Sequence, residues 1–307
     1  MKKEGKILRI DEDTILYDRF KVIAMLQKNS AYDLFLCVDS TNLDRRVVIK
    51  RAREIDSDLA AVHRLNHEIV ILREIDHLNV MKVSETFPAT GFPILAYAME
   101  YAERGSLSEN IAPRSLRRWL NILYQVASGL AAIHDRGVLH RDIKPDNILI
   151  SANDRVVISD FNIAIRFTEP DQSYDQRIVG SVNYVSPEYV ALGKSDITGD
   201  IYSLGVTAFQ LFTGRFPFEN KHLLDNLTAK VKDDPPKPST YNIALPAEID
   251  TFVLKCIARA PDARYQSSVA VVEALNALNV KLGFGEIDQV SLRAEKQLPS
   301  MAAKRAI

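Results

Sequence analysis

Apolar and polar positions in the first hundred residues form short runs that are typical of β-strands, with one helical segment among them. The strand-like runs lie at 16–26, 33–39, 45–50, 80–87 and 94–100. Residues 57–75 instead place apolar side chains at spacings of three and four, which predicts an amphipathic helix. We therefore expect strands accompanied by one main helix in this part of the chain.

The pattern becomes helical just beyond residues 100–105, where we place a boundary. One apolar stripe consists of Leu116, Leu120, Leu123, Val126, Leu130 and Ile133. Gly137 then lies where a glycine stop is expected. Short strands and loops are predicted for 138–165, and helices dominate from 200 onward. The charged, weakly periodic residues after 280 predict a linker or a loosely docked extension.

The composition is that of a soluble globular protein, because 47% of the 307 residues are apolar. The 39 Lys and Arg residues nearly balance the 40 Asp and Glu residues, which removes the electrostatic argument for nucleic-acid binding or a polybasic membrane patch. No apolar run approaches the roughly 18 residues of a membrane span. Cys37 and Cys256 lie in apolar runs, which predicts buried free thiols and a reducing, cytoplasmic location. A longer parent protein would have room for an anchor beyond Ile307.

A set of short motifs follows a fixed order along the chain. These are the lysine of "VVIK", a helix glutamate, "AMEY", "HRDIKPDN", "SDFN", "VGSVNYVSPE", "DIYSLG" and "PDARY". The most specific is "HRDIKPDN", His140–Asn147. In order and spacing the chain resembles serine/threonine protein kinases of the eukaryotic-like bacterial type, and the resemblance extends from about residue 17 to 278.

The resemblance implies an α+β, two-lobed protein kinase fold. Its N-lobe would be an antiparallel sheet with one main helix, and its C-lobe would be mostly helical. The expected domains are an N-terminal extension at 1–15, a kinase domain at 16–280 and a C-terminal tail or linker at 281–307. Within the kinase domain, the N-lobe would span 16–101 and the C-lobe 102–280.

The same resemblance implies transfer of the ATP γ-phosphoryl group to Ser or Thr of protein substrates, with autophosphorylation. Asp142 would orient the attacking hydroxyl and accept its proton, and Lys144 would steady the transferring group. Asn147 and Asp160 would hold Mg²⁺, with Mn²⁺ as an alternative. Lys50 would contact the inner phosphates of ATP, held by Glu68 from the predicted helix.

Other positions would bind the nucleotide or support the fold. The expected nucleotide-binding residues are Leu26, Gln27, Asn29, Leu34, Val48, Lys50, Met99, Glu100, Ala102 and Leu149. Glu188 and Arg264 match a buried ion pair with a structural role. Ser181 matches a hydroxyl that faces Asp142 and Lys144. Arg141 matches the arginine that orders a phosphorylated activation loop, in which Thr168 and Ser173 are the candidate phosphosites.

Two departures from the family pattern affect the phosphate-binding region. The hairpin "MLQKNSAYDLFLCV", Met25–Val38, has Gln27, Asn29 and Tyr32 where the family has three glycines. Asn162 stands at the glycine of D-F-G. Asparagine is the residue that best tolerates the left-handed conformations open to glycine, so Asp160 could still be presented correctly.

These departures leave two alternatives to a protein kinase. One is a pseudokinase that acts as a nucleotide-binding scaffold or allosteric partner. The chain nevertheless keeps every charged group of the site, and charges in a cleft are costly to maintain without a ligand. The other is a small-molecule phosphotransferase of the kinase-like fold, a class that lacks the "IKP" lysine and the "SPE" segment.

Overall fold

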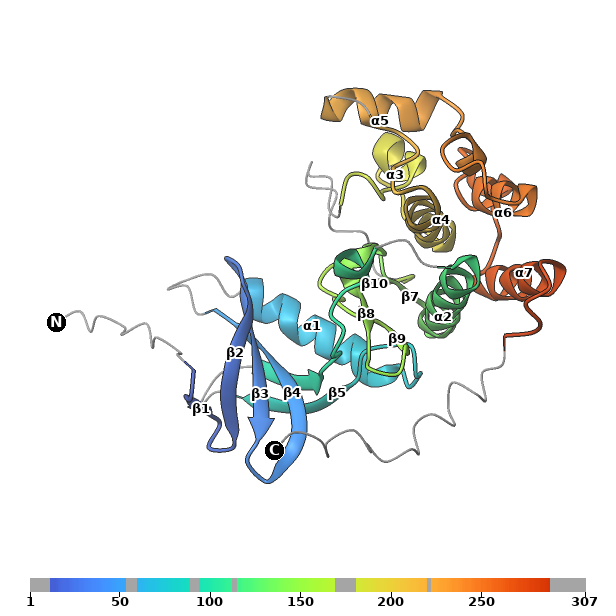
Figure 1. Ribbon diagram of the computed structural model, residues 1–307. Coiled ribbons are helices and arrows are strands. Elements are labelled where there is room, and N and C mark those ends of the chain that lie inside the picture. The colour runs from blue at the N-terminus through green and yellow to red at the C-terminus, as the bar shows by residue number, and fades with distance from the viewer. Residues whose placement is uncertain are drawn as a thin grey trace. The chain divides into compact units, whose positions relative to one another are not determined.

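The computed structural model describes residues 12–53, 60–88, 94–111, 115–168, 181–219 and 222–287 (Figure 1). The chain divides into two units. The first comprises the described residues up to Asp76, together with Val80–Ala102 and Asp160–Ile163. The second comprises His77–Asn79, Glu103–Ser159 and the described residues from Ala164 onward.

The first unit is a six-stranded antiparallel sheet with one helix. Its strands are β1 (Ile15–Leu16), β2 (Phe20–Lys28), β3 (Tyr32–Asp39), β4 (Asn42–Ala52), β5 (Val83–Pro88) and β6 (Ile94–Glu100). They are ordered β1-β2-β3-β4-β6-β5, and helix α1 (Ala60–Glu74) packs on β4, β5 and β6. The predicted sheet with one main helix is confirmed.

The run predicted as one strand at 16–26 is divided in the structure. Tyr17 and Asp18 adopt positive φ angles of 53° and 55°, which turn the chain between β1 and β2. The apolar pattern extends across this turn because Leu16, Phe20 and Val22 all enter the same core. The apolar positions in the sequence indicate that these three side chains are buried. They do not indicate that the backbone turns between Leu16 and Phe20.

The core of the first unit lies on one face of the sheet. Its members are Leu16, Phe20, Val22, Phe35, Cys37, Val47, Ile49, Phe87, Ala96 and Ala98. Because side chains alternate along a strand, Val47 and Ile49 of β4 join this core, whereas Val48 and Lys50 point to the opposite face. Lys50 pairs with Leu34 of β3 and Tyr97 of β6, which places it within the sheet.

The second unit is mostly helical, as predicted. Its α-helices in the described residues are α2 (Leu116–Asp135), α3 (Pro187–Leu192), α4 (Ile197–Thr213), α5 (Leu223–Lys232), α6 (Ala247–Cys256) and α7 (Ser268–Lys281). Helix α2 packs on α4 and α7. Two small sheets pair β7 (Val138–Leu139) with β10 (Ile165–Arg166), and β8 (Ile148–Ile150) with β9 (Val156–Ile158). Short 3₁₀ turns lie at Ser108–Asn110, Pro145–Asn147, Pro238–Thr240 and Pro261–Ala263.

Helix α2 illustrates how local sequence sets these elements. Its cap is Ser115, whose side chain accepts a hydrogen bond from the backbone N–H of Arg118. Its predicted apolar stripe is buried from Leu120 to Ile133. The chain then leaves the helix through Gly137 at φ +67°, a conformation that favours glycine. No helix in the described part of the chain is long and apolar enough to cross a membrane.

Both cysteines are buried free thiols, as predicted. Burial raises the pKa of the Cys37 thiol to about 12. The predicted terminal segments lie largely outside the described residues, which begin at Glu12 and end at Ile287.

Candidate active site

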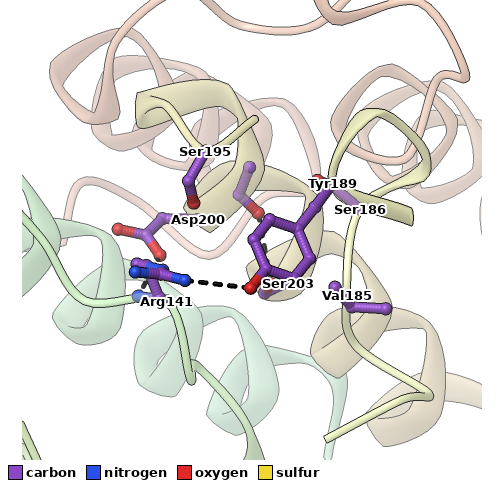
Figure 2. A pocket seen from close by; sticks show the side chains of 8 residues that line it. Arg141, Val185, Ser186, Tyr189, Ser195, Asp200 and Ser203 are labelled. Atoms are coloured by element: carbon purple, nitrogen blue, oxygen red, sulfur yellow. Dashed lines mark hydrogen bonds between the residues drawn. The ribbon is translucent and has the colours of Figure 1, made fainter. Parts of the chain in front are cut away.

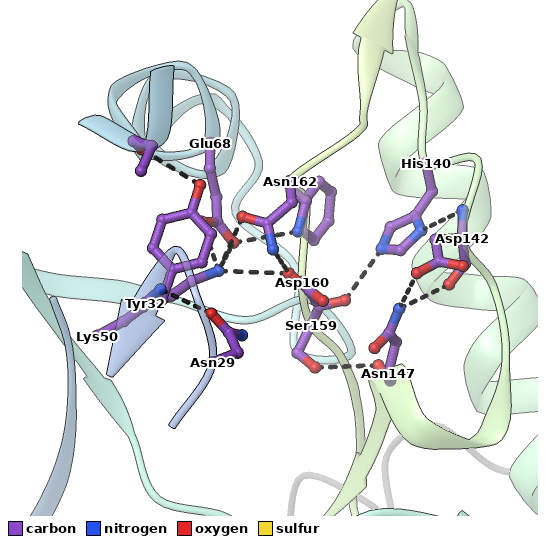
Figure 3. A network of polar contacts seen from close by, with 12 residues as sticks. Asn29, Tyr32, Lys50, Glu68, His140, Asp142, Asn147, Ser159, Asp160 and Asn162 are labelled. Atoms are coloured by element: carbon purple, nitrogen blue, oxygen red, sulfur yellow. Dashed lines mark hydrogen bonds and ion pairs between the residues drawn. The ribbon is translucent and has the colours of Figure 1, made fainter. Parts of the chain in front are cut away.

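A buried ion pair joins the sheet to α1 in the first unit (Figure 3). Lys50 Nζ lies 2.7 Å from Oε2 and 3.0 Å from Oε1 of Glu68, so the pair expected from the sequence is formed. The backbone N–H of Phe161 also donates to Glu68 Oε1 at 3.1 Å. Burial alone would lower the pKa of Lys50, but the charges of Glu68 and Asp160 hold it above its usual value. Lys50 is therefore a fixed positive charge.

The "SDFN" segment enters the same network. Asp160 Oδ1 lies 3.3 Å from Lys50 Nζ, and Asp160 adopts the left-handed conformation at φ +64°. Asn162 Oδ1 accepts a hydrogen bond from Lys50 Nζ at 3.1 Å, while Asn162 Nδ2 donates to Asp160 Oδ1. Asn162 thus contacts both charged groups.

The backbone of Asn162 differs from the glycine-like conformation that the sequence predicts. Asn162 is absent from the described non-glycine residues with positive φ, so it does not imitate the left-handed conformation of a glycine. Its side chain instead takes part in the hydrogen bonds of Lys50 and Asp160. The sequence shows the substitution but not the contact with Lys50, because Lys50 and Asn162 are more than a hundred residues apart in the chain.

The "HRDIKPDN" loop forms a second cluster, which lies in the second unit. Lys144 Nζ lies 2.7 Å from Asp142 Oδ2 and donates to Ser181 Oγ at 2.8 Å. Asn147 Nδ2 donates to Asp142 Oδ2 at 2.8 Å and to the Asp142 carbonyl at 2.9 Å. The structure therefore brings Asp142, Lys144, Asn147 and Ser181 together, and of these neighbours the sequence predicted Ser181 beside Asp142 and Lys144. A hydroxyl group is held directly beside the carboxylate and the lysine.

Asp200 of α4 anchors this loop, a role that the sequence interpretation did not assign. Its carboxylate accepts the backbone N–H of His140 at 2.9 Å and of Arg141 at 2.7 Å. It also lies 2.9 Å from His134 Nε2. Burial alone would raise the pKa of Asp200, but these hydrogen bonds and the two histidines lower it. The available signal was the motif "DIYSLG", whose first residue is this aspartate.

Arg141 faces α3 (Figure 2). Its Nη2 donates to the Tyr189 hydroxyl at 3.0 Å, and its guanidinium lies 5.4 Å from the centroid of the Tyr189 ring. Both residues line a cavity of about 20 Å³ together with Ser186, Ser195 and Ser203. The predicted contact of Arg141 with a phosphorylated loop stays a prediction, because 169–180, including Ser173, lie outside the described residues. Thr168 is described and exposed.

The glycine-free hairpin is closed by its own side chains. Asn29 Oδ1 accepts the backbone N–H groups of Ala31 at 2.9 Å and Tyr32 at 2.7 Å, while Asn29 N–H donates to the Tyr32 carbonyl at 3.1 Å. This is an Asx turn, which asparagine forms without a positive φ. Tyr32 is only 4% exposed. The sequence shows both residues only as replacements of glycines and does not predict these contacts.

The expected nucleotide-binding residues are distributed over both units. Leu26 and Gln27 lie on β2, Leu34 on β3, Val48 on β4, and Met99 and Glu100 on β6, with Ala102 just beyond. Val48 pairs directly with Met99 across β4 and β6. Leu26 is exposed, whereas Val48, Met99 and Ala102 are buried. Leu149 lies on β8 in the second unit.

Glu188 and Arg264 form the buried ion pair that the sequence predicted. Arg264 Nη1 and Nη2 donate to the two carboxylate oxygens of Glu188 at 2.8 and 2.7 Å. Arg264 is 2% exposed and also donates to the carbonyls of Ala258 and Thr198. Breaking a buried pair of this kind costs about 3–5 kcal/mol, because one charge is left without its partner.

Comparison with known proteins assigns most of the chain, including both clusters of polar residues described above, to one family. Residues 33–276 match the family model described as protein kinase domain. Serine/threonine-protein kinase PrkC of Bacillus subtilis is 30% identical over 254 residues, covering 81% of this chain and 39% of that protein. Serine/threonine-protein kinase PknB of Mycobacterium tuberculosis is 29% identical over 261 residues, covering 82% of this chain and 42% of that protein. The chain thus spans about two fifths of the length of these relatives.

Proposed function

Because this chain belongs to the protein kinase family, we propose that it transfers the γ-phosphoryl group of ATP to serine and threonine hydroxyls of protein substrates, including its own. The observation that carries the proposal is the contact of Lys144 with both Asp142 and the Ser181 hydroxyl. This contact supports a site in which the hydroxyl of a substrate lies beside the carboxylate of Asp142 and the ammonium of Lys144. The relatives' names, all of serine/threonine kinases, support the same acceptor.

Each polar residue has a defined part in the transfer. The acceptor oxygen forms a bond to the γ-phosphorus while the bond to the β,γ-bridging oxygen breaks and ADP leaves. Asp142 orients the acceptor hydroxyl and takes its proton late in the reaction. Lys144 offsets negative charge on the transferring group, which is the main catalytic requirement of a loose transition state. Lys50, held by Glu68, binds the inner phosphates.

The residues present suit a divalent metal. Asp160 supplies a carboxylate that is 38% exposed, and Asn147 supplies an amide oxygen, which are the oxygen ligands that magnesium takes. When bound, magnesium neutralises phosphate charge. We propose Mg²⁺ as the ion, with Mn²⁺ as an alternative.

The pseudokinase alternative gains no support from the comparisons, because the relatives are named as kinases. Those relatives are bacterial, and we propose a bacterial origin for the chain. We also propose that the domain works in the cytoplasm. The two buried free thiols fit a reducing compartment.

Removal of the proposed base tests the function. Purified protein is incubated with ATP and magnesium, and incorporated phosphate is measured by intact mass. We expect phosphate on the wild type and none on Asp142→Asn, because the amide cannot accept the hydroxyl proton. Both proteins should melt at similar temperatures, which shows that the variant is folded. Equal labelling of the two proteins would contradict the assignment.

Peptide mapping of the labelled wild type tests the phosphosites. We expect phosphate at Thr168 or Ser173, because both lie in the segment between Asp160 and Glu188, which ends beside Arg141 and its partner Tyr189. Phosphate found only elsewhere in the chain would reject both sites while leaving the kinase assignment intact.

A further inference from the structure

Tyr32 occupies a position where this chain differs from its family. The sequence resemblance expects a glycine there, and glycine has no side chain to contact its surroundings. The backbone of Tyr32 is fixed on both sides by Asn29, whose side chain accepts the Tyr32 N–H and whose N–H donates to the Tyr32 carbonyl. The direction in which the Tyr32 side chain leaves β3 is therefore set by the hairpin turn itself.

The Tyr32 side chain joins three parts of the first unit (Figure 3). Its hydroxyl donates to the Ala61 carbonyl at 3.2 Å, in the first turn of α1. Lys50 Nζ lies 4.8 Å from the centroid of its ring, within the range of a cation–π contact. One buried phenol thus touches the hairpin, the phosphate-binding lysine and the helix.

The helix contact matters because α1 also carries Glu68. A carbonyl oxygen has two lone pairs, so Ala61 can accept the Tyr32 hydroxyl without giving up its place in the helix. Glu68 lies two turns further along the same helix, where it holds Lys50. A restraint on the first turn therefore also restrains the helix position on which the Lys50–Glu68 pair depends.

We propose that Tyr32 is a positioning residue that ties the glycine-free hairpin to α1 and so holds Lys50 and Glu68 in the geometry that binds phosphate. The proposal rests on the kinase function proposed above. Without glycines, the hairpin backbone cannot approach phosphate as closely as it does in the family pattern. The Tyr32 side chain instead restrains α1 and Lys50. Tyr32 acts on ATP only through Lys50 and Glu68.

Two variants separate the hydroxyl from the ring. Tyr32→Phe removes the bond to Ala61 and keeps the ring beneath Lys50, whereas Tyr32→Gly restores the family residue and removes both contacts. We expect Tyr32→Phe to lower kcat about two- to tenfold, the range that corresponds to one lost hydrogen bond. The KM for ATP should change less than kcat, because the ring still faces Lys50. Tyr32→Gly should lower kcat further.

A second readout does not depend on catalysis. Hydrogen exchange of the α1 amides, measured on the intact chain, should be faster in both variants than in the wild type. Tyr17→Phe is the matched control, because it removes a phenol hydroxyl from another tyrosine of the same unit, whose ring stacks on Phe87 with the ring centroids 4.1 Å apart. It should change neither kcat nor exchange in α1.

The outcomes separate this proposal from the proposed function. Wild-type kcat and wild-type exchange of α1 in both Tyr32 variants would overturn the positioning role. A loss of thermal stability with unchanged α1 exchange and an unchanged ratio of kcat to KM would show that Tyr32 only fills the core, which also overturns it. If the wild type transfers no phosphate, the kinase function fails, and the exchange measurement still decides whether Tyr32 restrains α1.

Discussion

Asn162 is a single side chain that bonds to both charged groups next to it. Its amide oxygen accepts from Lys50 Nζ, and its amide nitrogen donates to Asp160. In the function proposed above, ATP phosphate binds Lys50 and a metal ion binds Asp160. On that proposal, nucleotide and metal compete with the side chain of Asn162 for these two groups.

Replacing Asn162 tests this competition. We expect Asn162→Gly to lower the KM for Mg-ATP about two- to tenfold, because each displaced hydrogen bond costs roughly 0.5–1.5 kcal/mol. Asn162→Ala is the control that removes the amide without adding the backbone freedom of glycine. Steady-state kinetics at varied ATP measure the effect. A KM that is unchanged or raised in both variants would show that the amide does not compete with the nucleotide.

Helix α5 holds the backbone of the segment that follows Ser181. Lys230 of α5 is 2% exposed, and its Nζ donates to the carbonyls of Val182, Asn183 and Val185 at 2.8, 2.6 and 3.1 Å. The same ammonium lies 5.8 Å from the ring centroid of Tyr202. The guanidinium of Arg264 also lies over this ring, 4.9 Å from its centroid. One helix side chain thus fixes the chain next to the hydroxyl that faces Lys144.

Burial lowers the pKa of Lys230 to about 7. In the unfolded chain, Lys230 stays protonated up to the ordinary lysine pKa of about 10.4. Between pH values of about 7 and about 10.4, the unfolded state therefore binds more protons than the folded state. The contribution of Lys230 to the free energy of unfolding should therefore rise with pH above about 7 and level off near the ordinary value. The three carbonyl acceptors favour the protonated form and act against the shift.

Thermal unfolding of the wild type and Lys230→Met across pH 6–9 measures this contribution. We expect the difference in Tm, wild type minus variant, to increase as the pH rises above about 7. The variant also loses the three hydrogen bonds to the carbonyls, so its absolute Tm is not the test. Parallel Tm curves for the two proteins would show that Lys230 does not titrate in this range.

At the scale of the whole molecule, the sequence predicted the architecture well. The alternating strands and the amphipathic α1 and α2 follow from local periodicity, because burial of one face repeats at the period of each element. The ion pairs Lys50–Glu68 and Glu188–Arg264 were also identified, because each residue lies in a recognisable motif. The sequence does not show the turn at Tyr17 and Asp18, because Leu16, Phe20 and Val22 on either side enter one core and their even spacing is that of a strand.

The sequence alone determined the order of the motifs, the identity of the charged residues and the family to which they belong. Tertiary structure decided what the unusual residues do. Asn29 closes a turn, Tyr32 reaches Ala61, and Asn162 bonds to Lys50 and Asp160. A pattern along the chain reports which side chains are apolar, charged or small. The partners of a polar side chain depend on which distant segments fold against it, and only the folded chain fixes those distances.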